Sequence, residues 1–242
     1  MMAPRGKFSV EPLYVQVRNL LAQRIASGVW APGSMLPNEM ELARELGVSP
    51  GTVRKALDNL ESDRLVLRRQ GRGTSVVDQG SGEVAARFSN IRNVGGRRVV
   101  GDMELLTQTK AAATEDEQQR LQLNARDPVL RTTRLRRYKS QLFMHEEASL
   151  AVSRFPGLDG ADAGNYRISA LAQSHGILLA KASERVTLEE ATSQTAKRLE
   201  INARARLLKL DRVIYAADGC PVEWRVALCS LKEDLLYFAE MT

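Results

Sequence analysis

Two short apolar stripes, separated by a turn of very few residues, restrict the fold of this chain more than any other feature. In the first stripe Asn38 is a helix N-cap, and Glu41 stands three residues on to complete a capping box before a glycine supplies the stop. In the second, Ser49 is the cap and Pro50 occupies the first helical position. Residues 38–61 therefore predict two helices joined by a tight turn, the helix-turn-helix motif.

One further helix and a hairpin flank this motif. Apolar residues recur at helical spacing between residues 12 and 28, which predicts a helix of about four turns. After the motif, β-rich runs at 65–69 and 74–77 enclose a Gly-containing turn, which predicts a β-hairpin. A helix, a helix-turn-helix and a hairpin in this order predict a winged helix-turn-helix domain over residues 1–77.

Positive charge is concentrated in this first part of the chain. The formal net charge is +6, and residues 1–77 hold 11 Lys and Arg against 7 Asp and Glu, whereas residues 78–242 hold 24 against 22. Four of the arginines fall within nine residues, namely Arg64, Arg68, Arg69 and Arg72. Such a cluster is typical of proteins that bind polyanions, although a charge run is also what a solvated face carries.

The second helix of the motif has one polar face, because its apolar stripe uses Val53, Ala56, Leu57 and Leu60. A helix of this kind fits the major groove of DNA, where its first residues reach bases and phosphates. Arg54 can donate a bidentate pair to guanine or clamp a phosphate. In the alternative interpretation, Ser49 is only a cap and Arg54 only a solvated charge. The helix residues expected at DNA are Ser49, Gly51, Thr52, Arg54 and Lys55.

The hairpin carries a similar signal. Two glycines permit a tight turn with positive φ, and the arginines near its tip can enter the minor groove or grip a phosphate. The alternative is a charged edge hairpin that its arginines protect from aggregation. The hairpin residues expected at DNA are Arg69, Gly71, Arg72 and Thr74.

The rest of the chain predicts a second domain of mixed type. Residues 78–96 begin with a polar, Gly-rich stretch and are expected to form a linker, followed by a domain over 97–242. Strands dominate there without regular crossover helices, which favours an antiparallel α+β sheet. The expected strands are 98–108, 129–137, 143–151, 182–188, 207–216 and 222–230, and the expected helices are 115–121, 166–174 and 193–199.

Composition disfavours several other classes of protein. Cys220 and Cys229 do not form a Cys-x-x-Cys pair, which is typical of a cytosolic chain with reduced thiols. No stretch approaches the roughly 18 apolar residues of a membrane span, and the start of the chain lacks the apolar run of a signal peptide. His145 and His175 are too few and too scattered for a zinc cage, and are expected to be structural or surface groups. We therefore expect a cytoplasmic protein without a metal, a cofactor or a membrane partner.

The first domain resembles a known family. The segments 13–17 (LYVQV), 33–39 (GSMLPNE), 42–57 (LARELGVSPGTVRKAL) and 68–74 (RRQGRGT) are similar to the DNA-binding domain of GntR-family bacterial transcription regulators, over about 65 residues. The resemblance implies a homodimer that binds a palindromic operator in double-stranded DNA.

Three positions depart from the family pattern. Met40 and Pro50 stand where the family often has arginine, and Asn38 replaces the usual serine. Arg54 and the hairpin must therefore carry more of the base readout, and the family's usual operator is not assumed.

The second domain also resembles a known type. Residues 129–137, 143–147 and 218–224 are similar to the effector-binding domain of the HutC subgroup, called UTRA, whose fold is like that of chorismate lyase. The resemblance covers roughly residues 97–242. It implies a six-stranded antiparallel sheet flanked by helices, dimerisation through this domain and a pocket for a small molecule.

Five residues are expected in that pocket. Arg134 and Arg136 alternate along one strand, so they share a face and can clamp a carboxylate or a phosphate. By the resemblance they match an Arg-x-Arg pair, Glu146 matches a residue that binds ligand hydroxyls, and Glu223 matches the Glu of a Pro-Val-Glu-Tyr motif. Tyr166 stands where the family commonly begins Ser-Leu-Tyr, so the phosphate-binding serine is absent and a small carboxylate fits no worse than a phosphosugar. The alternative is that Arg134 or Arg136 only pairs with Glu146 across the sheet.

These patterns favour a ligand-responsive DNA-binding transcription regulator, a repressor released from its operator by a small anionic effector. A chorismate-lyase type of enzyme acting on a small carboxylate is an alternative. The winged helix and the lack of a nucleophile–base pair argue against it. A sequence-independent nucleic-acid binder is a third hypothesis, and it predicts no operator preference.

Overall fold

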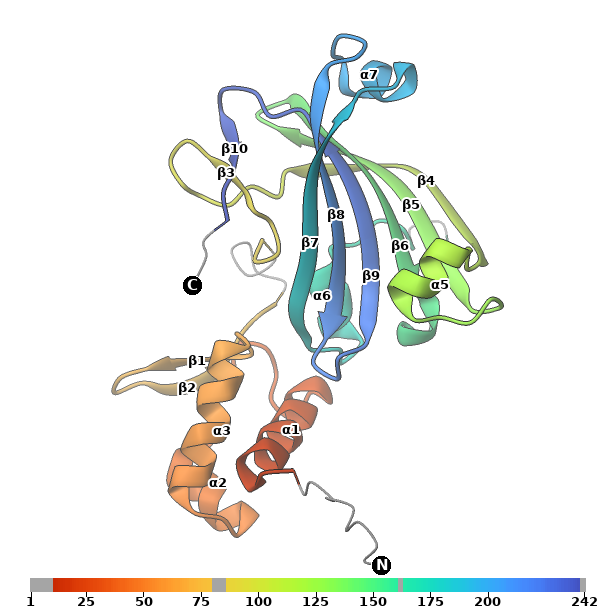
Figure 1. Ribbon diagram of the computed structural model, residues 1–242. Coiled ribbons are helices and arrows are strands. Elements are labelled where there is room, and N and C mark those ends of the chain that lie inside the picture. Colours follow the sequence, from red (N-terminus) through yellow and green to blue (C-terminus); the bar gives the residue numbers. More distant parts are fainter. Residues whose placement is uncertain (1–10, 80–85, 161–162, 240–242) are drawn as a thin grey trace, which may run out of the picture. The chain divides into compact units, whose positions relative to one another are not determined.

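The computed structural model describes residues 11–79, 86–160 and 163–239, and the chain divides after Asp78 into two compact units (Figure 1). The first unit is Met1–Asp78 and the second is Gln79–Thr242. None of the helices in the described ranges is long and apolar enough to cross a membrane. The same ranges contain no group of three or more side chains that could hold a metal ion.

The first unit is the expected winged helix. Its elements are α1 (Leu13–Ala26), α2 (Glu39–Leu46), α3 (Pro50–Ser62), β1 (Val66–Arg69) and β2 (Gly73–Val76). Leucines from all three helices form its core, and Leu21, Leu42, Leu57 and Leu60 are each no more than 1% exposed. The strands β1 and β2 pair antiparallel as the predicted hairpin.

Local hydrogen bonds explain why α2 and α3 begin where they do. The Asn38 side chain accepts the Glu41 N–H, and the Glu41 carboxylate accepts the Asn38 N–H, each at 2.9 Å, so the predicted capping box is confirmed. Gly47 ends α2 with a left-handed φ of 65°, a conformation that costs glycine little. Ser49 then caps α3 by accepting the Thr52 N–H at 3.1 Å.

The second unit is built on one large antiparallel sheet. Its six strands lie in the order β4-β5-β6-β9-β8-β7, and a separate two-stranded sheet pairs β3 with β10. The antiparallel α+β class predicted from the sequence is confirmed. The elements of this unit are β3 (Ile91–Asn93), β4 (Asp102–Ala112), α5 (Glu115–Leu121), β5 (Pro128–Tyr138), β6 (Gln141–Ala151), the 3-10 turn η1 (Val152–Arg154), α6 (Ile168–Ser174), β7 (Leu179–Glu190), α7 (Ser193–Leu199), β8 (Arg206–Ala216), β9 (Pro221–Cys229) and β10 (Leu235–Tyr237).

Helices cover both faces of the large sheet (Figure 1). On one face, α6 packs with Leu130 and Ile214 in a shared apolar cluster. On the other face, α5 packs on Val129 and α7 packs on Leu135. Because successive strand residues point to opposite faces, each strand places its even- and odd-numbered side chains in different environments.

Several boundaries differ from the expectation. The first large strand, expected at 98–108, occupies Asp102–Ala112, and the helix expected from Tyr166 begins two residues later at Ile168. Neither β3 nor β10 was expected, because strands of three residues carry no readable alternation. Since β3 lies within 78–96, part of the expected linker belongs to the folded second unit.

The helix α5 is tied to the sheet by one buried carboxylate. Glu117 accepts hydrogen bonds from Arg131 Nε at 2.7 Å, from Ser149 Oγ at 2.6 Å and from the Thr114 N–H at 2.8 Å. Burial alone raises the pKa of Glu117. The donors outweigh that effect and lower the pKa from 4.5 to about 2. The ionised form is therefore stabilised in the folded chain.

This shift makes stability depend on pH. A depressed carboxyl pKa adds stability that is present above pH 4.5 and is lost as the pH falls toward 2. We expect Glu117→Gln to lower the free energy of unfolding at pH 7 by about 2–3 kcal/mol and to flatten its decline between pH 4.5 and 2. Urea unfolding across this pH range checks the prediction. Glu115→Gln, an exposed change in the same helical turn, is the control. Equal effects of the two variants would contradict it.

Candidate functional site

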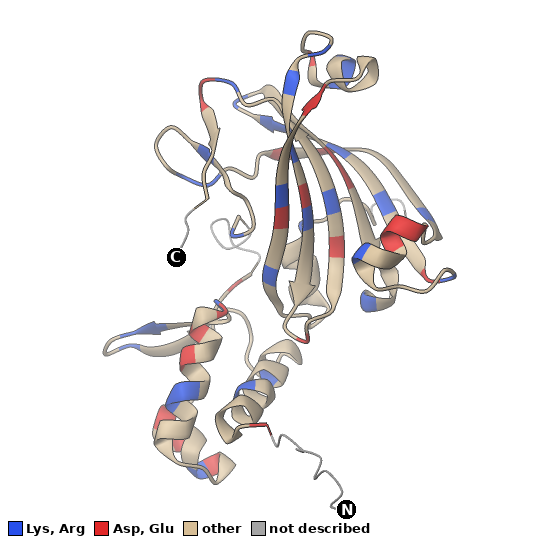
Figure 2. Ribbon diagram, viewed as in Figure 1, with Lys and Arg blue, Asp and Glu red and all other residues tan. Residues whose placement is uncertain are grey.

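The exposed face of α3 carries the residues expected at DNA. Val53, Ala56 and Leu57 are buried, whereas Gly51, Arg54 and Lys55 are exposed and Thr52 is half-buried. The two hydroxyls at the start of the helix, of Ser49 and Thr52, lie 2.8 Å apart and bond to each other. The polar face predicted from the apolar stripe is thus exposed. Figure 2 marks the positions of the charged residues along α3 and the hairpin.

The two cations of this face differ in their contacts. Arg54 donates from Nε to Glu39 Oε2 at 3.0 Å, and its Nη2 forms an ion pair with the same oxygen at 2.9 Å, while the side chain stays 63% exposed. The hydrogen bond and the charge of Glu39 raise the pKa of Arg54, so the guanidinium stays charged. Lys55 places its Nζ 4.0 Å from the centre of the Tyr14 ring, a cation–π contact between α3 and α1.

The hairpin presents a second set of polar groups. Arg69, Gly71 and Arg72 are exposed, and the Arg72 N–H donates to the Arg69 carbonyl at 2.9 Å to close the turn. Gly71 and Gly73 have φ values of 73° and 88°, as the tight turn requires. Thr74 is half-buried on β2. The structure therefore displays the two arginines at the tip, where a long anionic partner can reach them.

Arg68 differs from Arg69 and Arg72, because its side chain is held by contacts within the first unit. It donates to Asp58 at 2.6 Å and to the Arg54 carbonyl at 3.0 Å, and its side chain is only 24% exposed. These contacts tie β1 to α3. Arg68 therefore orients the hairpin. The sequence alone did not separate Arg68 from the neighbouring arginines of the run.

The second unit contains a small cavity on the face of the sheet that α6 covers. Its volume is about 50 Å³, which is room for a few water-sized groups. Its walls come from strands of the large sheet, from the start of α6 and from the segment 88–100. Four of the five residues expected in the effector pocket line it, namely Arg134, Arg136, Tyr166 and Glu223.

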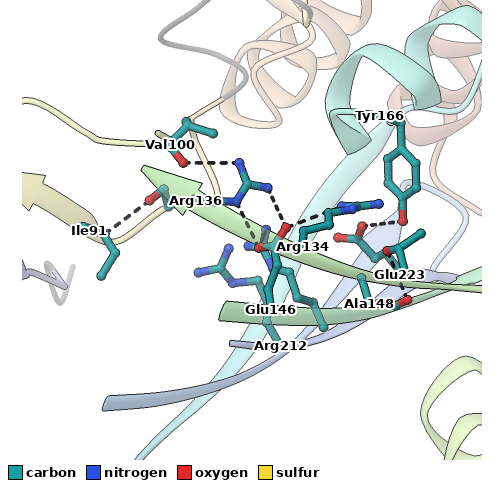
Figure 3. Close-up of polar contacts among 12 residues, drawn as sticks. Ile91, Val100, Arg134, Arg136, Glu146, Ala148, Tyr166, Arg212 and Glu223 are labelled. Carbon is teal, nitrogen blue, oxygen red and sulfur yellow. Dashed lines mark hydrogen bonds and ion pairs between the residues drawn. The ribbon is translucent and has the colours of Figure 1, made fainter. Parts of the chain in front are cut away.

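The fifth residue, Glu146, does not line the cavity but is fully buried beside Arg134 and Arg136 (Figure 3). Arg136 donates to both of its oxygens, from Nε at 3.0 Å and from Nη2 at 2.8 Å, and Arg225 donates at 3.2 Å. Arg134 lies 3.5 Å away as a third cation. Burial alone raises the pKa of Glu146, but these positive charges hold it far below its usual range.

The cross-strand alternative therefore describes part of this site. Arg134 and Glu146 are register partners on β5 and β6, and Arg136 donates to both oxygens of the Glu146 carboxylate. The pairs are buried, however, and do not lie on a solvated face. Buried charges of this kind persist only when they are paired and hydrogen-bonded.

Arg134 has a different role in the cluster. Its guanidinium carbon lies 4.0 Å from the centre of the Tyr166 ring, and the Tyr166 hydroxyl donates to Glu223 Oε1 at 3.0 Å (Figure 3). Within the described residues, Arg134 Nε and Nη2 and Glu223 Oε2 are buried and have no hydrogen-bond partner. Two donors and one acceptor are thus unsatisfied in the same cavity, which is costly unless a ligand satisfies them.

Two further arginines belong to this site and were missed. Arg212 and Arg225 are register partners on β8 and β9, and both line the cavity. Strand alternation could have identified Arg212, because it lies between Leu210 and Ile214 on the buried face of its strand. A lone charge at an inward strand position indicates a functional or paired group.

The arginines and glutamates around the cavity form what we call the arginine cluster, in which positive charges outnumber negative charges. Arg212 donates to Glu184 at 2.6 Å, and burial followed by the charge of Arg225 lowers the pKa of Arg212 to about 10, so it remains protonated at neutral pH. Four guanidiniums therefore face three carboxylates within the described part of the cluster, leaving one excess positive charge. The members of the arginine cluster are Arg134, Arg136, Arg212, Arg225, Glu146, Glu184 and Glu223.

The segment 88–100 forms one wall of the cavity and is bound to the arginine cluster. The Val100 carbonyl accepts from Arg136 Nη1 at 3.2 Å, and Asn90 donates to Glu184 at 3.0 Å. This segment follows the point at which the chain divides into two units. The segment that forms this cavity wall is therefore close in sequence to the connection with the first unit.

Both histidines lie outside this cavity. His145 is buried, and its Nε2 lies 2.7 Å from Arg198 Nη1. Burial, followed by the charge of Arg198, lowers the pKa of His145. His175 Nδ1 lies 3.0 Å from the Leu171 carbonyl. Both rings thus have contacts within the second unit.

Comparisons with known proteins agree with both units. Residues 13–76 match the family described as bacterial regulatory proteins, gntR family. Residues 97–233, which are more than half of the chain, match the UTRA domain.

Curated relatives and solved structures extend this likeness over most of the chain. The mannosyl-D-glycerate transport/metabolism system repressor MngR of Escherichia coli (strain K12) is 26% identical over 215 residues, 88% of this chain and 90% of that protein. The histidine utilization repressor of Pseudomonas putida is 35% identical over 103 residues, 42% of each chain. The crystal structure of PhnF from Mycobacterium smegmatis superposes with a TM-score of 0.53 at 26% identity, covering 93% of this chain and 99% of that one. This protein is a member of the GntR family of bacterial transcription regulators, with an N-terminal winged helix-turn-helix and a C-terminal UTRA domain, and it acts as a ligand-responsive DNA-binding regulator.

Proposed function

We propose that this regulator is a repressor that binds a palindromic operator as a homodimer and is released by a small anionic effector. The observation that carries the effector part is the unsatisfied pair of nitrogens on Arg134, beside an excess positive charge. An enzyme of the chorismate-lyase type is not favoured, because the relatives are regulators. A cytoplasmic location, where the operator is, belongs to the same proposal.

The proposed DNA interface is the outer face of α3 together with the tip of the hairpin. Arg54 is the proposed base reader, because it is the exposed guanidinium on the helix that fits the major groove. Arg69 and Arg72 are proposed to grip phosphate or the minor groove. The remaining proposed contacts are Ser49, Gly51, Thr52, Lys55, Gly71 and Thr74.

An Arg54→Ala variant tests this interface. We expect affinity for a duplex enriched from random sequence by the wild-type protein to fall about 5- to 150-fold, and affinity for random duplex to fall less. Fluorescence anisotropy at one fixed salt concentration measures both values. Arg126→Ala, which removes an exposed charge from the second unit, is the control and should change neither.

Other outcomes have distinct meanings. Equal losses on both duplexes would assign Arg54 to phosphate and not to a base. If the wild-type protein enriches no duplex at all, it has no operator preference, and the repressor proposal fails in favour of a sequence-independent binder.

The proposed effector combines an anionic group with a hydrogen-bond donor. The anionic group would accept from Arg134 Nε and Nη2, and a hydroxyl or ammonium would donate to Glu223 Oε2. Arg136, although it lines the cavity, is held by Glu146 and would act on the ligand mainly through its charge. A carboxylate and a phosphate both fit this description. The name of the Escherichia coli relative refers to mannosyl-D-glycerate, an acid, which agrees with an anionic effector.

Release from DNA requires that the effector favours one of two states of the protein. We propose that the segment 88–100 carries the difference, because it lines the cavity and follows the division between the units. A thermal-shift screen of small carboxylates and phosphates identifies ligands that bind the folded chain. A ligand that binds the second unit and leaves operator affinity unchanged would contradict this mechanism.

A further inference from the structure

We propose that Glu39 is a specificity-determining residue, which acts by holding the guanidinium of Arg54 in position for DNA readout. The inference rests on the proposed function of α3. Glu39 is the first residue of α2, and its Oε2 accepts from Arg54 Nε at 3.0 Å and lies 2.9 Å from Nη2 in the same ion pair. Glu39 is a positioning residue in this scheme, because it would act on DNA through Arg54.

The same carboxylate also reaches the hairpin. Its other oxygen, Oε1, lies 3.7 Å from Arg68 Nη2, and Arg68 in turn bonds to Asp58 and to the Arg54 carbonyl. One side chain of α2 therefore links Arg54 on α3 to Arg68 on β1. Glu39 is at the junction of the three elements that the proposed interface uses.

The geometry leaves the reading edge of Arg54 available. A guanidinium has five N–H groups, and the contact with Glu39 uses those on its Nε side. The fork formed by Nη1 and the second Nη2 hydrogen stays available, and this fork matches the O6 and N7 acceptors of guanine. Fixing the other edge removes rotamers that the free side chain would otherwise lose on binding.

The position of this acid is not explained by helix stability alone. An acid in the first turn favours the helix dipole, but Glu41 already supplies one there as part of the capping box. A carboxylate beside a polyanion also weakens binding by charge repulsion. The two arginine contacts explain why an acid stands at this position. Glu39 lowers the general affinity for DNA, but it orients Arg54.

The test compares Glu39→Gln with Glu45→Gln. Both remove one negative charge from α2, but Glu45 pairs with Arg24 of α1 at 2.7 Å and does not touch Arg54. Each full-length variant is titrated with the duplex enriched by the wild-type protein and with random duplex. We expect Glu39→Gln to bind random duplex more tightly and to lower the ratio of specific to random affinity by about fivefold or more. Glu45→Gln should leave that ratio unchanged.

Two further variants complete the test. In an Arg54→Ala background, Glu39→Gln should not lower the ratio again, because its effect passes through Arg54. Glu39→Asp keeps the charge but shortens the side chain, so it should lower the ratio without raising affinity for random duplex. If Glu39→Gln does not fold, Glu39→Asp alone still tests whether Glu39 positions Arg54.

The outcomes separate this inference from the proposal on which it rests. If Arg54→Ala lowers the ratio while Glu39→Gln behaves like Glu45→Gln, Glu39 is only a surface charge and the inference is overturned. If no duplex is enriched by the wild-type protein, the proposed operator binding fails instead.

Discussion

Glu146→Gln should destabilise the second unit more than any other single charge removal described above. Three guanidiniums surround this carboxylate, which is itself fully buried. Removing one partner of a buried ionic network leaves uncompensated charge and costs about 3–5 kcal/mol. For a chain of this size we expect the thermal midpoint to fall by about 6–20 °C, measured by circular dichroism.

The neighbouring residue supplies the control for this change. Glu147 follows Glu146 on β6 but is exposed, so Glu147→Gln makes the same chemical change outside the arginine cluster. Its midpoint should shift by less than about 2 °C. Similar small shifts in both variants would mean that water or the backbone already solvates the arginines, and the electrostatic account of the cluster would be wrong.

Arg134→Met should abolish the response to effector while preserving DNA binding. Methionine keeps an apolar stem against Tyr166 but removes the two unsatisfied nitrogens that we assign to the ligand. Loss of buried, charge-assisted hydrogen bonds costs about 2–5 kcal/mol, so ligand affinity should fall about 30-fold or more. Isothermal titration with a ligand from the thermal-shift screen measures the loss. The affinity of the ligand-free variant for operator should equal that of the wild type.

Arg137→Met on the same strand is the matched control. Arg137 is partly exposed and lies 3.5 Å from Glu104, away from the cavity lining. It should bind the ligand as the wild type does. If Arg134→Met also retains full affinity, the anionic group is held elsewhere and the proposed effector site is wrong.

Local signals predicted the elements whose ends are set by nearby residues. The caps at Asn38 and Ser49 are short-range hydrogen bonds, so the residues around them determine where α2 and α3 begin. The helices α5 and α7 occupy the predicted ranges for similar reasons. The strand β4 was misplaced by about four residues, because an edge strand that is largely exposed has a weak alternation signal.

Strand pairings and side-chain contacts between residues far apart in the sequence could not be predicted from local sequence patterns. β3 and β10 form because they pair with each other across most of the second unit, and neither is long enough to show a period. In the site, Arg134 and Arg136 were predicted to share a face by their spacing. Their different contacts depend on neighbouring strands: Arg136 is held by Glu146, whereas Arg134 is left with unsatisfied nitrogens. No spacing rule on a single strand distinguishes the two.

The pairing of β3 with β10 means that residues far apart in the sequence support the proposed effector pocket together. Tyr237 of β10 donates to Glu184 at 2.8 Å, and Glu184 holds Arg212 at the cavity. A premature stop codon or a frameshift just upstream of Leu235 would leave the DNA-reading portion of the gene product intact. It would nevertheless remove the strand that pairs with β3 and the Tyr237 contact with Glu184, so a truncated product is expected to bind DNA without a normal response to the effector.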